Sequence, residues 1–360
     1  MATLKADTIK VAFYVYPTAF QSPGGGEVLL LKTKEYLEKA GVSVKLFDPW
    51  NDKLEAFDIL HTFGSVKDAL PMMEAARCAG IKNVLSTVCW YNWRSAWGNY
   101  GSVRARSLAV LRHAAKVFFP FVPSARKRMM DIADLLIPNS ESEADQLERF
   151  FLVPKKKITV IPNAVDPIFA NATPDLFIQK YNLRNFVLCV GRIEPRKNQL
   201  GMIRALSGTM MPFVIIGDPV KHYPDYYQAC RKAAGDNVHF LGGISHNSEL
   251  LRSAYVACNT FLLASWLETP GLAALEAGLA GAKIVITEEG ATREYFKDMA
   301  IYVKPCNIAG IRTAVSRSFE KPVDLRLREH IRQNYLWQNT AQTTTDVYRK
   351  LLLSKTRVAP

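Results

Sequence analysis

The arrangement of short apolar runs along this chain of 360 residues limits its fold more than any other feature. Runs rich in β-branched and aromatic residues alternate with longer segments in which apolar residues recur at helical spacing. This alternation is typical of parallel sheets that are covered by helices on both faces. The chain shows no low-complexity tract and no internal repeat of about 20 to 50 residues, which argues against solenoids and propellers. The sequence therefore predicts an α/β fold.

The alternating pattern occurs in two successive halves. In the first half we expect strands at residues 11–16, 42–47, 59–63, 84–88, 135–138 and 158–162. In the second half we expect them at residues 186–190, 213–216, 238–241, 260–264, 284–287 and 301–303. The helical segments between the strands are long enough to cross back over a parallel sheet. Two doubly wound, Rossmann-like domains follow from this pattern.

A loss of periodicity separates the two halves. Residues 163–174 contain Pro167, Asn171 and Pro174 and have the composition of a linker. The expected parts are an N-terminal domain at 1–166, a linker at 167–174 and a C-terminal domain at 175–334. Ligands of such sheets bind at the carboxyl ends of the strands. We therefore expect the two domains to face a central cleft, with the functional motifs just after strands.

Charge and cysteine usage narrow the class of protein. The 46 Lys and Arg residues against 33 Asp and Glu residues give a net charge of +13, which favours an anionic partner. The six cysteines show no CxxC spacing, so we expect buried thiols in a reducing compartment and neither disulfides nor a zinc site. The sequence has no signal-peptide pattern and no run of about 18 apolar residues. We expect a cytoplasmic protein.

Three glycines follow the first expected strand and precede a helix that begins near Glu27. Gly24, Gly25 and Gly26 would let the backbone approach a ligand closely, and the free amides at a helix start favour a phosphate. The segment matches neither the GxGxxG fingerprint nor a nucleotide triphosphate loop. Phosphate binding and a plain flexible turn both stay open.

A basic segment follows the first strand of the second half. Residues 191–198 read Gly-Arg-Ile-Glu-Pro-Arg-Lys-Asn, so Arg192 leaves the sheet at its carboxyl end and Lys197 begins the next helix. The forked guanidinium and the compact ammonium together suit a diphosphate. A solvated basic turn is the other interpretation.

The segment at residues 265–276 is the strongest indication of a ligand-binding site in the sequence. Glu268 lies in the loop after a strand, and Glu276 follows it, with seven residues between them, in an apolar helix. Thr269 as N-cap and Pro270 at the first helical position make a good helix start, whose amides favour an anion. Because a carboxylate is costly to bury without a partner, Glu276 is expected to contact a ligand.

These motifs, taken in order, carry a family resemblance. Further matching segments are Pro-Asn-Ser at 138–140, Ile-Pro-Asn-Ala-Val-Asp at 161–166 and Trp-Gln-Asn-Thr-Ala at 337–341 before Val-Tyr at 347–348. From about residue 10 to about residue 350 the chain resembles retaining GT-B glycosyltransferases of family 4. The resemblance implies a nucleotide-diphosphate sugar as co-substrate, no cofactor, and a C-terminal helix at 335–360 that completes the N-terminal domain.

The same resemblance implies catalytic roles for Glu268, Arg192 and Lys197. The two cations would neutralise the diphosphate leaving group as its charge grows. Glu268 and the backbone at Gly271 and Leu272 would hold the sugar and the distal phosphate.

Other donor-binding roles follow from the resemblance alone. Glu276 would accept hydrogen bonds from the ribose hydroxyls, Gly217 and Leu241 would line the base, and glycines 24–26 would meet the phosphates from the other domain. The sequence contains no Asp-x-Asp pair. We therefore expect no metal site and metal-independent activity.

One segment departs from the family pattern. Many relatives carry a His-Asp pair near the sugar, after the strand that ends at Val88, and this chain has Cys-Trp-Tyr-Asn there. His61, directly after Ile59 and Leu60, is the one histidine of the first half so placed beside a strand segment, and a structural role is its other interpretation. The acceptor-side candidates are Cys89, Trp90, Tyr91, Asn92 and His61. The departure leaves open a relative that binds a nucleotide sugar or glycan without catalysis.

Residues 75–130, called the basic stretch below, contain ten Lys or Arg residues and no Asp or Glu. Tryptophans and phenylalanines are interleaved with them. Such a surface suits an anionic membrane or the pyrophosphate of a polyprenyl-linked acceptor. An aromatic core with solvated charges is the alternative. Because no recognition helix or RNA-binding motif accompanies the charge, we do not expect nucleic acid as a partner.

The sequence as a whole predicts a retaining glycosyltransferase. It would move a sugar from a UDP- or GDP-sugar to a glycan or polyprenyl-linked acceptor in cell-surface polysaccharide or glycolipid synthesis. The protein would be free in the cytoplasm or peripheral at the inner face of the cell membrane. A non-catalytic binding relative and a nucleotide-sugar epimerase are the alternatives.

Overall fold

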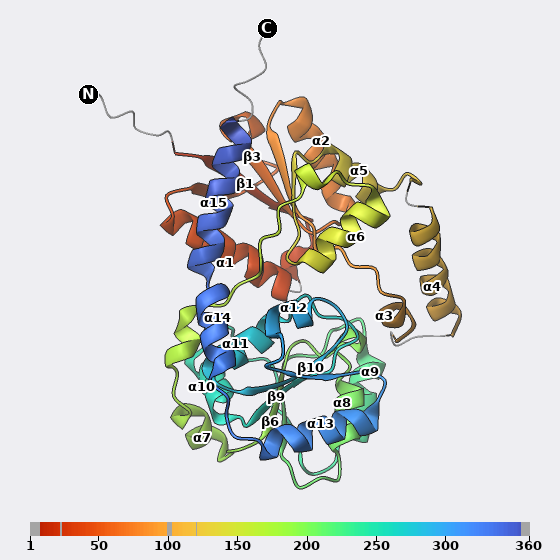
Figure 1. Cartoon of the computed structure of the whole chain (residues 1–360), viewed down its shortest axis with the longest axis vertical. Helices are drawn as coiled ribbons and strands as arrows, with labels where there is room; N and C mark the ends of the chain where they lie inside the picture. The colour runs from red at the N-terminus through yellow and green to blue at the C-terminus, as the bar shows by residue number, and fades with distance from the viewer. Residues whose placement is uncertain (1–7, 22–23, 99–102, 120, 354–360) are drawn as a thin grey trace, which may run out of the picture. The chain divides into compact units, whose positions relative to one another are not determined.

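The computed structural model describes residues 8–21, 24–98, 103–119 and 121–353. The chain forms two compact units, each built on its own sheet (Figure 1). The first unit comprises Met1–Trp90, Lys116–Asn163 and Trp337–Pro360, and the second comprises Tyr91–Ala115 and Ala164–Leu336.

The first unit contains a parallel sheet of five strands in the order β2-β1-β3-β4-β5. These strands are β1 (Lys10–Val15), β2 (Ser43–Leu46), β3 (Ile59–Phe63), β4 (Lys82–Ser86) and β5 (Leu135–Ile137). The helices of this unit are α1 (Gly25–Lys39), α2 (Leu70–Cys78), α5 (Ala125–Ile132), α6 (Glu141–Phe151) and α15 (Trp337–Leu353). In the register of the sheet, Phe13 on β1 lies opposite Leu46 on β2 and His61 on β3. Every residue of β3 is buried, as expected for a strand covered on both faces.

The strand expected at 158–162 is not formed. Ile158 makes only an isolated bridge with Leu136, although the N–H groups of Thr159 and Ile161 still bond to carbonyls along β5. The bond between these two would run from the N–H of residue 138 to the Thr159 carbonyl, but residue 138 is a proline, which has no N–H to continue a ladder. The segment therefore runs beside β5 without becoming a strand.

The second unit contains a parallel sheet of six strands in the order β11-β10-β9-β6-β7-β8. These strands are β6 (Val187–Val190), β7 (Phe213–Ile216), β8 (Val238–Phe240), β9 (Thr260–Leu263), β10 (Lys283–Thr287) and β11 (Ile301–Val303). Its helices include α7 (Asp175–Tyr181), α8 (Gln199–Leu206), α9 (Pro224–Ala233), α10 (Glu249–Ala257), α11 (Leu272–Ala280), α12 (Thr292–Phe296), α13 (Ile308–Glu320) and α14 (Arg326–Asn334). The strand order reverses between β6 and β9, which are paired. This reversal is the position where doubly wound sheets bind ligands.

The observed units differ from the predicted boundaries in two places. Tyr91–Ala115 carries α3 (Trp93–Gly98) and most of α4 (Val103–Phe118), and it groups with the second unit although the sequence places it in the first domain. The units divide after Asn163, and most of the expected linker is a 3₁₀ helix at Pro167–Asn171. Buried Phe169 anchors that helix, so it is packed structure and not a free connection.

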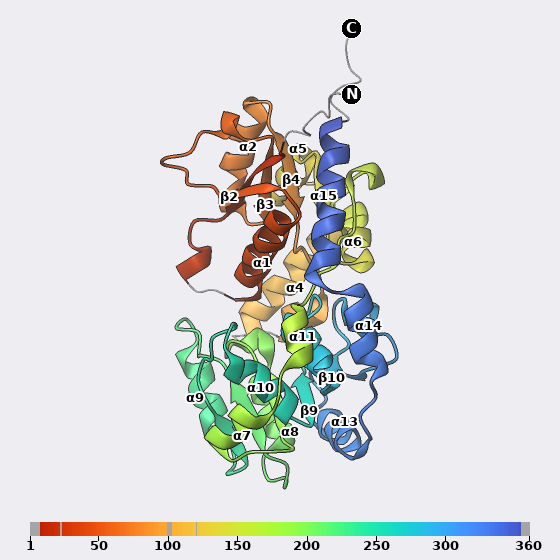
Figure 2. The same ribbon diagram turned by 90° about the vertical axis from the view of Figure 1, so that its left-hand side faces the viewer.

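Helix α15 packs on α1 within the first unit (Figures 1 and 2). The Trp337 ring stacks on Tyr36 with 6.3 Å between the centroids, and the hydroxyl of Tyr348 contacts His61. The two parallel sheets with their helices confirm the predicted α/β class with two doubly wound domains.

Candidate active site

The loops that follow β6 and β9 meet through a buried ion pair. Lys197 ends a 3₁₀ helix after β6, and Glu268 lies in the loop after β9. The Lys197 Nζ is 2.7 Å from Glu268 Oε1, and the two side chains are 16% and 4% exposed. The two motifs that the sequence singled out separately are therefore brought together at the switch point of the sheet.

The surroundings of this pair favour its charged form. Burial by itself raises the pKa of the Glu268 carboxyl, but the charges of Lys197 and Arg196 and hydrogen bonds from Lys197 and Ser265 outweigh burial and hold that pKa below its ordinary value. Burial lowers the pKa of Lys197, and the Glu268 charge opposes that shift. Glu268 is thus an ionised, buried carboxylate that is paired with the Lys197 ammonium.

The backbone of Glu268 is paired with the loop after β10. Its N–H donates to the Glu289 carbonyl at 3.1 Å, and its own carbonyl accepts from the Ala291 N–H at 3.0 Å. Gly290, at φ +105°, makes this pairing feasible, because a Cβ there would lie 2.0 Å from the Glu268 carbonyl oxygen.

The helix that carries Glu276 begins later than the sequence predicts. Thr269 and Pro270, expected as N-cap and first helical residue, lie in the loop and are joined by a cis peptide bond. Gly271 occupies the N-cap position of α11 with φ +91°, a left-handed conformation that turns the chain before the helix starts at Leu272. Gly271 and Leu272 therefore stand at the positive end of α11.

Glu276 is buried, as expected, but protein side chains already engage it. His246 Nε2 lies 2.7 Å from its Oε1, and the Tyr255 hydroxyl donates to its Oε2 at 2.8 Å. Burial raises the pKa of Tyr255 well above its ordinary value, which keeps that hydroxyl protonated as a donor. These partners satisfy the buried carboxylate, so its burial alone does not indicate a ligand, and the donor-binding role of Glu276 stays a prediction. Sequence reasoning missed His246 and Tyr255, since no spacing rule connects them to Glu276.

Arg192 lies at a more exposed edge of the same loop. Its side chain is 37% exposed, and its Nη2 is 3.6 Å from Glu194 Oε1, which also pairs with Arg196 at 3.2 Å. Arg196 in addition donates to the Leu267 carbonyl, and its own carbonyl accepts the Trp266 N–H. Arg196, which sequence reasoning did not select, therefore ties the two loops together.

The residues predicted to line the base occupy the same edge of the second sheet. Gly217 follows β7, and a Cβ there would lie 2.0 Å from the Gly191 carbonyl oxygen, so the loops after β6 and β7 touch. The Leu241 N–H, just after β8, bonds to the Ile215 carbonyl. The Gly243 N–H donates to Asp218 Oδ1 at 2.7 Å, which fixes the next turn of this edge.

In the first unit, the glycine turn is already capped by a carboxylate. The Gly24 N–H donates to Glu27 Oε2 at 2.6 Å, and Gly25 and Gly26 begin α1. Glu27 therefore supplies the negative charge that favours a helix start, and an anionic ligand would have to share that position.

His61 has the surroundings of a structural histidine. It is 1% exposed, its Nδ1 contacts the Tyr348 hydroxyl at 2.5 Å, and its Nε2 contacts Ser86 Oγ at 2.9 Å. Burial lowers its pKa to about 3, which keeps the ring neutral. The ring also lines a cavity of about 30 Å³.

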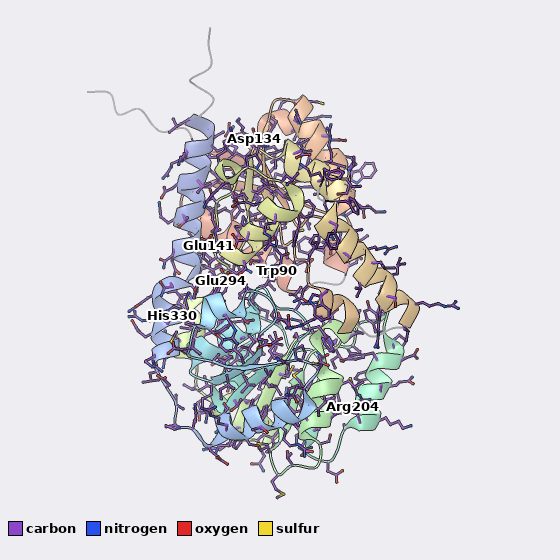
Figure 3. All side chains as sticks on the ribbon, turned by 45° about the vertical axis from the view of Figure 1, so that its right-hand side comes forward. Trp90, Asp134, Glu141, Arg204, Glu294 and His330 are labelled. Atoms are coloured by element: carbon purple, nitrogen blue, oxygen red, sulfur yellow. The ribbon has the colours of Figure 1, made fainter. Side chains whose placement is uncertain are left out.

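The segment that replaces the family's His-Asp pair divides between the two units. The Cys89 thiol is buried, and its backbone N–H donates to Glu143 Oε1 at 2.5 Å. Trp90, labelled in Figure 3, has a buried Nε1 with no hydrogen-bond partner among the described residues. Tyr91 and Asn92 belong to the second unit, where Asn92 binds Glu289. Sequence reasoning missed Glu143. Its carboxylate also accepts hydrogen bonds from the Thr87 hydroxyl, just after β4, and from the Asn139 N–H, just after β5.

The described residues contain no group of three or more His, Cys, Asp or Glu side chains that could hold a metal ion. None of the six cysteines, all of which lie among the described residues, forms a disulfide, and Cys78 and Cys306 are exposed, contrary to the expectation of buried thiols.

Comparisons with known proteins agree with this geometry. The model of the family "Glycosyl transferases group 1" matches residues 176–335, and that of "Glycosyltransferase Family 4" matches residues 53–169. An uncharacterized glycosyltransferase of Methanocaldococcus jannaschii is 26% identical over 59% of this chain and 59% of its own length. The O-antigen chain mannosyltransferase B of Escherichia coli is 24% identical over 62% of each chain. The alignments thus span about three fifths of these relatives.

Solved structures show the same fold. Sucrose-phosphate synthase from Thermosynechococcus elongatus superposes with a TM-score of 0.75 at 18% identity, covering 96% of this chain and all of that one. Anabaena HepE, solved with UDP and glucose, gives a TM-score of 0.68 at 17% identity over 94% of this chain and 99% of its own. The two family models match successive parts of the chain, and each of its two units contains a parallel sheet. This protein therefore belongs to the GT-B glycosyltransferases of family 4.

Proposed function

We propose that this protein transfers a sugar from a nucleotide-diphosphate sugar, UDP- or GDP-linked, to a glycan or polyprenyl-linked acceptor with retention of anomeric configuration. The observation that carries the proposal is the buried Lys197–Glu268 ion pair at the switch point of the second sheet. Family membership supports it, as do a curated relative named as an O-antigen mannosyltransferase and a fold neighbour solved with UDP and glucose. Such a role places the protein in cell-surface polysaccharide or glycolipid synthesis, on the cytoplasmic side.

The proposed reaction exchanges one bond at the sugar's anomeric carbon. The bond from that carbon to the diphosphate oxygen breaks, the nucleoside diphosphate leaves with the electron pair, the acceptor oxygen bonds the carbon, and the acceptor proton is released to solvent. Lys197 and Arg192 offset the negative charge that grows on the leaving group. Glu268 and the N-terminal turn of α11 hold the sugar and the distal phosphate.

Glu276 would bind the ribose in addition to its present partners. Each carboxylate oxygen has two lone pairs, so the contacts with His246 and Tyr255 leave room for ribose hydroxyls. The same contacts guide the choice of variant. Glu276→Ala would leave the buried Tyr255 hydroxyl without its acceptor, whereas Glu276→Gln keeps an oxygen there.

Calorimetry with UDP, GDP and a panel of their sugars tests the donor assignment. Wild type should bind one nucleotide series, and a donor at 100 times its dissociation constant should stabilise the fold by about 2.7 kcal/mol. Glu276→Gln should weaken binding by about 1.5 to 3 kcal/mol per lost charge-assisted bond. The exposed Glu329→Gln serves as the matched control. Unchanged affinity in Glu276→Gln contradicts the ribose assignment.

Product analysis separates this activity from the alternatives. Transfer yields a glycosylated acceptor and free nucleoside diphosphate, epimerisation yields an isomeric nucleotide sugar, and a non-catalytic relative yields neither. NMR of the product bond reports its anomeric configuration. We also propose that Arg192 and Lys197 replace a divalent cation, so the transfer rate should survive EDTA. A loss of rate that added metal restores contradicts this.

We further propose that α4 lies on an anionic membrane surface. Leu108, Leu111 and Phe118 are exposed on α4 together with Arg104 and Arg112. An exposed apolar strip flanked by cations is the pattern of an interfacial helix. No acidic residue interrupts the basic stretch around it. Among the described residues, no helix has the length and apolar composition that a membrane crossing requires.

Vesicle sedimentation tests this membrane proposal. Arg106 is half-buried and Lys116 lies outside the side chains described, so Arg104→Gln with Arg112→Gln is the clearer variant. Each charge near an anionic surface contributes about 1 kcal/mol, so the pair should reduce vesicle binding more than tenfold. Arg349→Gln, an exposed position outside the basic stretch, is the matched control. Wild type that never sediments with acidic vesicles, or equal sedimentation of the double variant, contradicts the proposal.

A further inference from the structure

Residues 91–98, called the strap below, bind both carboxylate oxygens of one buried glutamate in the second unit. Asn92 Nδ2 donates to Glu289 Oε2 at 2.7 Å, and Arg94 Nη1 donates to Glu289 Oε1 at 2.9 Å. The Glu289 side chain is 9% exposed, so its charge is costly without these donors. The strap therefore supplies a hydrogen-bond donor to each oxygen of this carboxylate and a positive charge that offsets its own.

Asn92 is fixed in place by a second role. Its Oδ1 accepts the backbone N–H groups of Arg94 at 2.8 Å and Ser95 at 3.2 Å, which caps the start of α3. With the oxygen committed to the cap, the amide nitrogen points to Glu289. The same orientation of the Asn92 side chain therefore caps the start of α3 and contacts Glu289.

The other end of the strap packs on the loop that carries Glu268. A Cβ on Gly98 would lie 2.1 Å from Cε3 of the Trp266 ring, so the ring covers the glycine directly. The Trp266 N–H is bonded to the Arg196 carbonyl, next to Lys197. Both ends of the strap therefore reach segments that build the Lys197–Glu268 site.

We infer that the strap is a positioning element for Glu268, with Asn92 and Arg94 as positioning residues for sugar binding; this inference rests on the function proposed above. They act through Glu289, whose carbonyl accepts the Glu268 N–H, and Gly290, which lets the two loops approach.

This role is specific for one end of the donor. The contacts of Asn92 and Arg94 lead through Glu289 to Glu268, assigned to the sugar and the distal phosphate, whereas Glu276 and Gly217, assigned to ribose and base, lie on other segments. Loss of the Asn92 and Arg94 contacts should therefore weaken binding of the nucleotide sugar more than binding of the free nucleoside diphosphate.

Hydrogen exchange of the full chain without ligand is the first test. In an Asn92→Ala/Arg94→Gln variant, the amides of Glu268 and Ala291 should exchange at least about tenfold faster than in wild type, because the loop they join loses its support. Arg293→Gln is the matched control, since it removes an arginine from the neighbouring Glu288. Equal exchange in wild type and double variant overturns the inference.

Calorimetry with a nucleotide sugar and its free diphosphate is the second test. The double variant should bind the sugar form about tenfold more weakly and the free diphosphate with a smaller loss. Gly98→Ala, which displaces the strap without removing a charge, should reproduce this split, and Arg94→Lys should recover part of it. Equal loss for both ligands overturns a sugar-specific role. A wild type that binds neither ligand overturns the proposed function, whereas normal binding with normal exchange in the variants overturns the strap alone.

Discussion

Lys197 and Glu268 form a buried ion pair, so replacing one of them alone should destabilise the protein more than replacing both. Lys197→Met leaves the buried carboxylate without its cation and should lower the free energy of unfolding by about 3 to 5 kcal/mol. The double variant Lys197→Met/Glu268→Gln carries no buried charge at these two positions and should lose less than the single one. Urea unfolding of wild type, both singles and the double gives the coupling energy. Additive losses contradict the pairing.

The same pair predicts a dependence on acid. The pKa of Glu268 is below its ordinary value of 4.5, so between the two values the unfolded chain binds more protons than the folded one. Stability from this group is therefore present above about pH 4.5 and is lost as the pH falls towards the lower folded value. The stability difference between wild type and the neutral double variant should shrink from about pH 6 to about pH 3 in urea unfolding. A constant difference contradicts this.

Residue types and spacing identified the glutamates, but the sequence could not reveal their partners. Glu268 and Glu276 stood out because carboxylates are rare in apolar surroundings. His246 and Tyr255, which engage Glu276, come from segments that only the folded sheet brings together. The strap contact with Glu289 joins residues almost 200 positions apart, beyond any local pattern.

At the scale of elements, two glycines with similar backbone angles should respond differently to substitution. Gly281, at φ +100°, has open space around it, so Gly281→Ala should cost only about 1 to 2 kcal/mol of backbone strain. Gly290, at φ +105°, faces the Glu268 carbonyl, so Gly290→Ala should cost more and also weaken binding of a nucleotide sugar. Urea unfolding and calorimetry measure both effects. Equal costs contradict the tight pairing of the loops.

Strands and helices could be predicted where the spacing of apolar residues determines them. They could not be predicted where the backbone geometry of a single residue determines whether an element forms or where it begins. Eleven of the twelve expected strands form, because buried parallel strands read as short apolar runs. The strand at 158–162 fails opposite Pro138, and α11 starts after the left-handed Gly271 and not at Pro270. A backbone angle is set by the packed fold, so the sequence alone left it undetermined.

At the scale of the whole molecule, the end of the chain belongs to the unit in which the chain begins. Tyr348 on α15 is fully buried against His61, and Thr340 donates to the Pro162 carbonyl at 3.1 Å. Helical spacing gives α15 its apolar face, but spacing cannot say which sheet that face covers. The family resemblance supplied that expectation.

A truncated chain tests how far the first unit depends on this helix. A chain that ends at Leu336 exposes the buried faces of α1 and the first sheet, and it leaves His61 Nδ1 without its hydroxyl partner. Hydrogen exchange should then show lost protection in β1 to β5 and retained protection in β6 to β11, whose unit ends at Leu336. A chain that ends at Leu353 keeps all of α15 and is the matched control, which should exchange as the full chain does. Protection of β1 to β5 that persists without residues 337–360 would show that the first sheet is stable without its last helix.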